Sequence, residues 1–285
     1  MANPVLKSQP AFGDSATKYQ QEQYAAQYLQ QYGQTTTQQY GQTYGQTGFN
    51  EQPYYAQPDA VTQPQTATGT RALTYEDVII KTAGLIAVVF ITGALSWQVA
   101  NPALIYGGLI AGLVLGLINS FKKSPSPALI TLYAACQGLA LGGISKIFEF
   151  AYSGIVIQAL LATATTVVAV LALHVSGKFR VTAKFKKWVF TLGLGYFLFI
   201  VINLILNLFG VTGFNGFREG PIGLVVGLFA VGLAAAFLLI DFNDIREGVE
   251  AGVDAKFAWT AAFALLVTII WMYIEFLRLL AIFRD

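Results

Sequence analysis

Two acidic residues have the placement in this sequence that best suits chemistry. Asp241 directly follows the apolar run Phe237–Ile240, and Glu275 lies inside the apolar segment Trp271–Leu280. Ionisable groups inside membrane helices are rare and mark functional sites by default. Two carboxylates that meet in a low dielectric cannot both ionise cheaply, so the pair would share one proton. Deprotonated, the same oxygens are hard ligands that suit Ca²⁺. The sequence therefore predicts a proton-sensitive pair that binds Ca²⁺ transiently.

Three more charged residues are candidates to support this pair. Arg278 lies three residues after Glu275, on the same helical face. The alternative interpretation of Glu275 and Arg278 is a salt bridge within one helix, of structural value only. Asp244 follows Asp241 closely, and Glu149 lies just beyond an apolar run, where a side chain that reaches the membrane interface is the favoured interpretation. For Asp241 the alternative is a helix-end residue solvated at the interface.

Composition excludes several other kinds of site. The chain has one cysteine, Cys136, and one histidine, His174, which excludes an internal disulfide and a thiolate cluster and argues against a histidine zinc site. Seventeen Lys and Arg against 15 Asp and Glu provide no basic surface for nucleic acid. A two-acid intramembrane protease needs two aspartates and a Pro-Ala-Leu after them, but both such triplets here precede the acids. We expect neither an enzyme nor a resident cofactor.

Long apolar segments must position these acids. Of the 285 residues, 55% are hydrophobic and 11% charged, whereas soluble proteins carry about 25% charged residues. Seven apolar runs of about 20 residues can each cross a bilayer as a helix, and continuous runs of this length exclude barrel strands. The sequence predicts an all-α, seven-transmembrane-helix bundle over residues 71–285, with spans at Thr82–Ala100, Ala103–Phe121, Ala128–Ser145, Gly154–Val175, Trp188–Gly210, Pro221–Ile240 and Phe257–Phe283.

The first 70 residues have a different character. They contain sixteen Gln and eight Tyr, and Tyr-Gly-Gln-Thr recurs at 32–35, 40–43 and 44–47. This composition cannot bury enough apolar surface to fold, so we predict a disordered tail. Its role is either to solubilise the chain or to bind itself or a membrane-protein partner.

The distribution of Lys and Arg predicts the orientation. Eleven lie on the side of the bundle that carries the tail, and four lie on the other side. By the positive-inside rule the N-terminus is cytoplasmic in a multi-pass protein of the cell (plasma) membrane. Within the bilayer, small residues must allow the helices to pack closely. Glycines at four-residue spacing predict such seams: Gly108, Gly112 and Gly116; Gly138 and Gly142; Gly223 and Gly227.

Two motifs in the last apolar segments carry a family resemblance. They are Asp241-Phe-Asn-Asp-Ile245 and Met272-Tyr-Ile-Glu-Phe-Leu-Arg-Leu-Leu280. Together with Ser126-Pro-Ala-Leu129, Gln137–Gly142 and Gly177–Thr182, they resemble the Bax inhibitor-1 (TMBIM) family, in particular its bacterial members, over about residues 71–285. The resemblance implies a last helix at the centre of two three-helix layers. It also implies a pH-sensitive Ca²⁺ leak that is gated by an acidic pair on the sixth and seventh helices.

The acids of this chain match that pair with some departures. Asp241 matches the first acid, and Glu275 occupies the place of the second, which is usually Asp. Arg278 stands where a polar uncharged residue is commoner, and Gln137 where an acid is frequent. Some bacterial relatives suggest the competing function, a non-conducting interaction protein that modulates a membrane protease or a stress response.

Overall fold

A computed structural model describes residues 71–99, 101–178, 180–210 and 220–284. The predicted disordered tail, residues 1–70, lies outside this part. The described residues form seven long helices that are apolar enough to cross a membrane, which confirms the predicted all-α bundle. They are α3 (Tyr75–Val99), α4 (Pro102–Phe121), α5 (Pro127–Ala151), α6 (Ile155–Val175), α7 (Ala183–Leu208), α8 (Gly220–Glu250) and α9 (Ala258–Ile282), the last preceded by the short 3₁₀ helix η2 (Ala255–Phe257).

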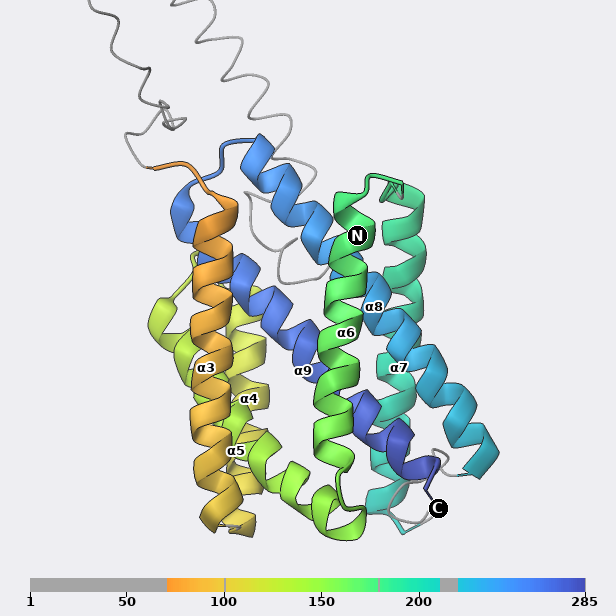
Figure 1. Cartoon of the computed structure of the whole chain (residues 1–285). Coiled ribbons are helices and arrows are strands. Elements are labelled where there is room, and N and C mark those ends of the chain that lie inside the picture. Colours follow the sequence, from red (N-terminus) through yellow and green to blue (C-terminus); the bar gives the residue numbers. More distant parts are fainter. Residues whose placement is uncertain (1–70, 100, 179, 211–219, 285) are drawn as a thin grey trace, which may run out of the picture.

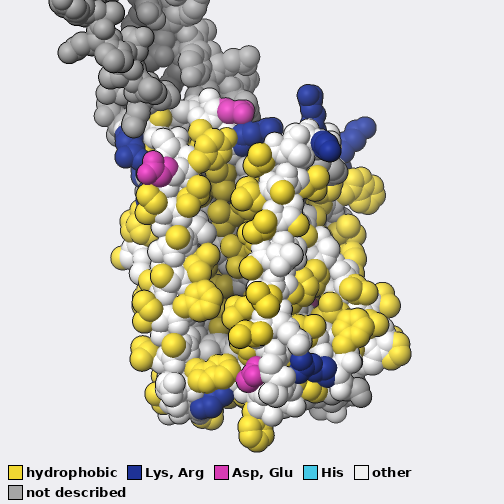
Figure 2. All heavy atoms as spheres, in the orientation of Figure 1, with side chains coloured by type: hydrophobic (Ala, Val, Ile, Leu, Met, Phe, Trp, Pro, Cys, Tyr) yellow, Lys and Arg dark blue, Asp and Glu magenta, His cyan; other side chains and the backbone are white. Residues whose placement is uncertain are grey.

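The helices are arranged around α9, as the resemblance implied. Helices α3, α4 and α5 pack together on one side of α9, and α6, α7 and α8 pack together on the other (Figure 1). Most of α9 is buried, including Phe263, Leu266 and Leu277. Large apolar side chains instead cover the outside of the bundle, where they face lipid (Figure 2). The protein is therefore a multi-pass membrane protein whose last helix is its core.

Proline starts two of the helices. Pro102 and Pro127 each occupy the first turn, where the missing N–H costs no hydrogen bond. Asn101 also caps α4, because its side-chain oxygen accepts a hydrogen bond from Ala103 N at 2.8 Å.

Helix α8 is longer than predicted, and this changes the setting of Asp241. The sequence predicted a span that ends at Ile240, but the helix continues to Glu250. It continues because Ile245 and Val249 keep an apolar stripe that packs in the core with Leu73 and Val253. The interpretation of Asp241 as a solvated helix-end residue is therefore wrong.

Glycine seams hold α3, α4 and α5 together, as predicted. A Cβ on Gly138 would lie 2.5 Å from Val89 O, and one on Gly108 would lie 2.6 Å from Cys136 O. A Cβ on Gly112 of α4 would contact the Gln137 side chain of α5. At a separate contact, a Cβ on Gly227 of α8 would contact Leu279 of α9. Only glycine allows these pairs of helices to approach so closely.

Candidate functional site: buried carboxylates on α8 and α9

Asp241 lies at the centre of the bundle. Its side chain is fully buried, at 0% exposure, on the part of α8 that packs against α9. Thr268 of α9 donates a hydrogen bond from Oγ1 to Asp241 Oδ2 at 2.7 Å. The hydrogen bond satisfies one oxygen of a group that would otherwise be very costly to bury, and it joins α8 to α9.

Glu275 is also buried, at 2% exposure, and has donors from two helices. Its Oε1 accepts from Tyr196 OH of α7 at 2.6 Å and from Trp271 Nε1 at 3.2 Å. Arg278 donates from its guanidinium to Oε2, and this ion pair is nearly closed to solvent. The indole and the guanidinium can only donate, so Glu275 accepts from both.

Aromatic rings surround this carboxylate. Trp271 stacks on Tyr196 with ring centroids 5.8 Å apart, and Phe237 meets Trp271 edge-on, also at 5.8 Å. These rings come from α7, α8 and α9. They exclude lipid and water from Glu275, so the ion pair with Arg278 acts in a low dielectric.

The two carboxylates are bound at successive turns of α9. Thr268 binds Asp241 and Trp271 binds Glu275, and these donors are three residues apart. Three residues advance a helix by about 4.5 Å along its axis. Both acids of the predicted pair are thus buried and accept hydrogen bonds from successive turns of α9.

Asp244 belongs to a different cluster, between α7 and α8. Its carboxylate is buried and forms an ion pair with Lys186 Nζ at 2.6 Å, and Lys186 also reaches Glu247 at 3.0 Å. Asn243 donates to the other oxygen of Glu247 at 2.6 Å. This network joins α7 to α8, one helical turn beyond Asp241.

Glu149 stabilises the connection between α5 and α6. Its carboxylate accepts from Gly154 N at 2.6 Å and from Val156 N at 3.1 Å, at the start of α6. These are the unpaired N–H groups of a helix N-terminus, where a negative charge is favourable. Arg284 donates hydrogen bonds to Ser153 O and to the Gln158 side chain at the same connection, and so holds the residues after α9 against it.

A comparison with known protein families identifies the family of this chain. The family described as Bax inhibitor 1 like matches residues 3–285. The chain belongs to this family. No curated protein matches the chain. Membership agrees with the fold expected from the resemblance, seven apolar helices with a buried C-terminal helix.

Sequence reasoning missed most of the partners of the acids in this member of the Bax inhibitor 1 like family. Trp271 could have been found, because it lies four residues before Glu275 on the same helical face. Thr268 and Tyr196 bind their acids from other helices, and Lys186 lies far from Asp244 in the chain. No pattern in the sequence connects those pairs.

Among the described residues, no group of three His, Cys, Asp or Glu side chains that could hold a metal ion occurs.

Proposed function

We propose that this protein provides a proton-modulated pathway for cations, Ca²⁺ in particular, across the cell membrane. Asp241 and Glu275 are the gating pair. The observation that carries the proposal is the burial of both carboxylates inside the bundle, with donors on successive turns of α9. The Bax inhibitor 1 like family, to which the chain belongs, supports it.

Protonation acts on this contact through the charge of the acids. Glu275 is held by Tyr196, Trp271 and Arg278, so it is the fixed member of the pair. Asp241 accepts a hydrogen bond from the neutral hydroxyl of Thr268, and we assign the gain or loss of the proton to this acid. A change of one charge in a low dielectric changes how α8 packs on α9, and this changes access to the pathway.

The proposal also includes a supporting role for Asp244 and an orientation of the bundle in the membrane. The ion pair of Asp244 with Lys186 holds α7 against α8, next to the gate. Lys and Arg side chains gather at the end of the bundle where α3 begins (Figure 2). We place this end in the cytoplasm.

The test is Ca²⁺ flux into liposomes that contain the purified protein, measured over a pH series. We expect flux that changes with pH in the wild type and that no longer follows pH in Asp241→Asn, because an amide cannot titrate. Glu275→Gln should change the flux at every pH, since it removes the charge that Arg278 binds. Glu76→Gln, which removes an exposed carboxylate from the first turn of α3, is the control and should behave as the wild type. Absence of flux at every pH, or an unaltered pH profile in Asp241→Asn, contradicts the proposal.

The second candidate function is a non-conducting interaction protein, and one observation favours it. The residues that follow the tail are attached to the loop between α8 and α9, through Leu73 N to Val253 O at 2.6 Å and Ala255 N to Arg71 O at 2.9 Å. A partner that binds the tail would therefore act on both helices of the acidic site. Crosslinking in cells with and without residues 1–70 tests this function. Partners that depend on the tail support it, and an identical set of partners removes the tail from it.

A further inference from the structure

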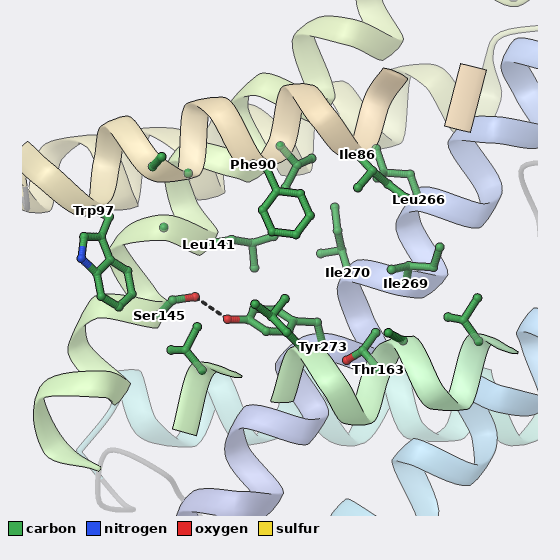
Figure 3. A pocket seen from close by; sticks show the side chains of 18 of the residues that line it. Ile86, Phe90, Trp97, Leu141, Ser145, Thr163, Leu266, Ile269, Ile270 and Tyr273 are labelled. Atoms are coloured by element: carbon green, nitrogen blue, oxygen red, sulfur yellow. Dashed lines mark hydrogen bonds between the residues drawn. The ribbon is translucent and has the colours of Figure 1, made fainter. Parts of the chain in front are cut away.

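A groove with no connection to the acidic site opens between α3 and α6 (Figure 3). Its volume is about 640 Å³, which is within the range of sites that hold small molecules. Leu266, Ile270 and Tyr273 of α9 form the floor, and Leu141 of α5 closes one side. Almost every lining atom is apolar, so the groove suits a hydrocarbon and not an ion.

The groove is open towards the bilayer. Phe90 of α3 and Val168 of α6 line it and are 56% and 65% exposed on the outer surface of the bundle. Figure 2 shows this face hollowed between the two helices. Because both helices span the membrane, the molecules that reach this opening are lipids.

The length of the groove matches one leaflet. Its lining runs along α3 from Ile86 to Gln98 and along α6 from Val156 to Val168. At 1.5 Å per residue each of these stretches is about 18 Å long. Half of a hydrocarbon core is about 15 Å. The groove therefore extends from one surface to the bilayer centre, as one acyl chain does.

Three polar side chains that line the groove are hydrogen-bonded within the protein. Ser145 Oγ and Tyr273 OH share a hydrogen bond of 2.6 Å, and Thr163 Oγ1 donates to Ala159 O at 2.7 Å. Gln98 lines the groove close to the end of α3. Beyond Gln98, towards the bilayer centre, the occupant needs no polar group.

The Lys146 ammonium lies at the end of the groove that is nearer to the membrane surface. Lys146 donates one hydrogen bond from Nζ to the carbonyl oxygen of Trp97, at 2.7 Å. An ammonium has three donors, and no ion pair of Lys146 occurs within the described part of the chain. Lysine and tryptophan at a helix end are typical of the level of the lipid headgroups. The remaining charge suits a phosphate.

We propose that this groove binds one phospholipid, with an acyl chain between α3 and α6 and the phosphate at Lys146. The lipid comes from the leaflet at which α3 ends. It is a resident lipid, held more tightly than the lipids around the bundle, because its acyl chain contacts four helices, α3, α5, α6 and α9.

This lipid lies on the opposite side of α9 from the carboxylates. At 100° per residue, Leu266, Ile270 and Tyr273 share one face of the helix, whereas Thr268, Trp271 and Glu275 share the other. Filling the groove leaves the hydrogen bonds of Asp241 and Glu275 in place. Lipid binding and cation flux can thus be tested separately.

The test is native mass spectrometry of the detergent-purified protein, together with extraction and identification of its lipids. Ala164→Trp places a large ring in the groove from an exposed position on α6. Ala169→Trp is the matched control, since Ala169 is exposed on the same helix but does not line the groove. Lys146→Gln keeps a donor for Trp97 O and removes the charge.

We expect one bound phospholipid per chain in the wild type and in Ala169→Trp, and at least a tenfold lower occupancy in Ala164→Trp. Lys146→Gln should retain a lipid but lose the preference for anionic over neutral headgroups in competition with defined lipids. Equal occupancy in the two tryptophan variants, or no lipid in the wild type, overturns the proposal. Dimers that Ala164→Trp abolishes would also overturn it, and would assign the groove to a second copy. An unchanged headgroup preference in Lys146→Gln overturns the assignment of the phosphate.

Discussion

Arg278→Met is expected to lower the free energy of unfolding by about 3–5 kcal/mol, because it leaves Glu275 buried without its counter-charge. The carboxylate keeps Tyr196 and Trp271 as donors, but neither is charged. Reversible unfolding by SDS in mixed micelles measures the loss. The size of the effect follows from burial, since only 13% of the Arg278 side chain and 2% of the Glu275 side chain are exposed.

Two further variants show that the loss comes from a buried charge. The double variant Glu275→Gln with Arg278→Met removes both charges and should recover most of the lost stability, because replacing a whole buried pair is often close to neutral. Arg246→Met breaks an exposed pair with Glu250, where 44% and 66% of the side chains are exposed. It should change the free energy of unfolding by less than about 1 kcal/mol. A double variant that is no more stable than Arg278→Met contradicts this explanation.

The ion pair also distinguishes the two carboxylates of the site. Arg278 was expected on the same face as Glu275 from their spacing, and it does bind Glu275. The Arg278 guanidinium thus places a cation at Glu275, whereas Thr268 gives Asp241 a neutral hydroxyl donor. These contacts are the basis on which we propose Asp241 as the titrating acid.

The helices could be predicted because membrane spans are long and continuous. Each apolar run overlaps one of the seven helices. The central place of α9 was expected only from the family resemblance, because other spans are as apolar as α9. The end of α8 could not be found in this way. Polar residues from Asp241 onward suggested a helix end, but Asp244 is paired with Lys186 and remains inside the fold.

The site could be predicted only as far as single residues. An acid inside an apolar run is visible in the sequence, and this was sufficient to select Asp241 and Glu275. Their partners Thr268, Tyr196 and Trp271 are ordinary residues of membrane helices, and their role depends on how α7, α8 and α9 rotate against each other. The groove between α3 and α6 is likewise absent from any sequence pattern, because it is a space that packing leaves open.

Close packing makes the glycine seams the most sensitive positions outside the site. Gly142 of α5 lies against the backbone of Gly93 of α3, and a Cβ there would lie 2.7 Å from the Gly93 Cα and closer still to its carbonyl oxygen. A clash with backbone cannot be relieved by a rotamer change, so α3 and α5 must separate. We expect Gly142→Ala to lower the free energy of unfolding by about 3 kcal/mol or more, at the upper end of the cost of overpacking.

Neighbouring glycines of α4 provide the control for this prediction. A Cβ on Gly108 would lie 2.6 Å from Cys136 O and 2.9 Å from Ala140 N, whereas one on Gly107 would have no atom within 4 Å. Gly108→Ala should therefore be strongly destabilising, and Gly107→Ala should be neutral or slightly stabilising, since alanine is the better helix former. The same SDS titration compares all three variants. Equal stability of Gly107→Ala and Gly108→Ala would contradict the seam, because the two substitutions differ only in what the added methyl group meets.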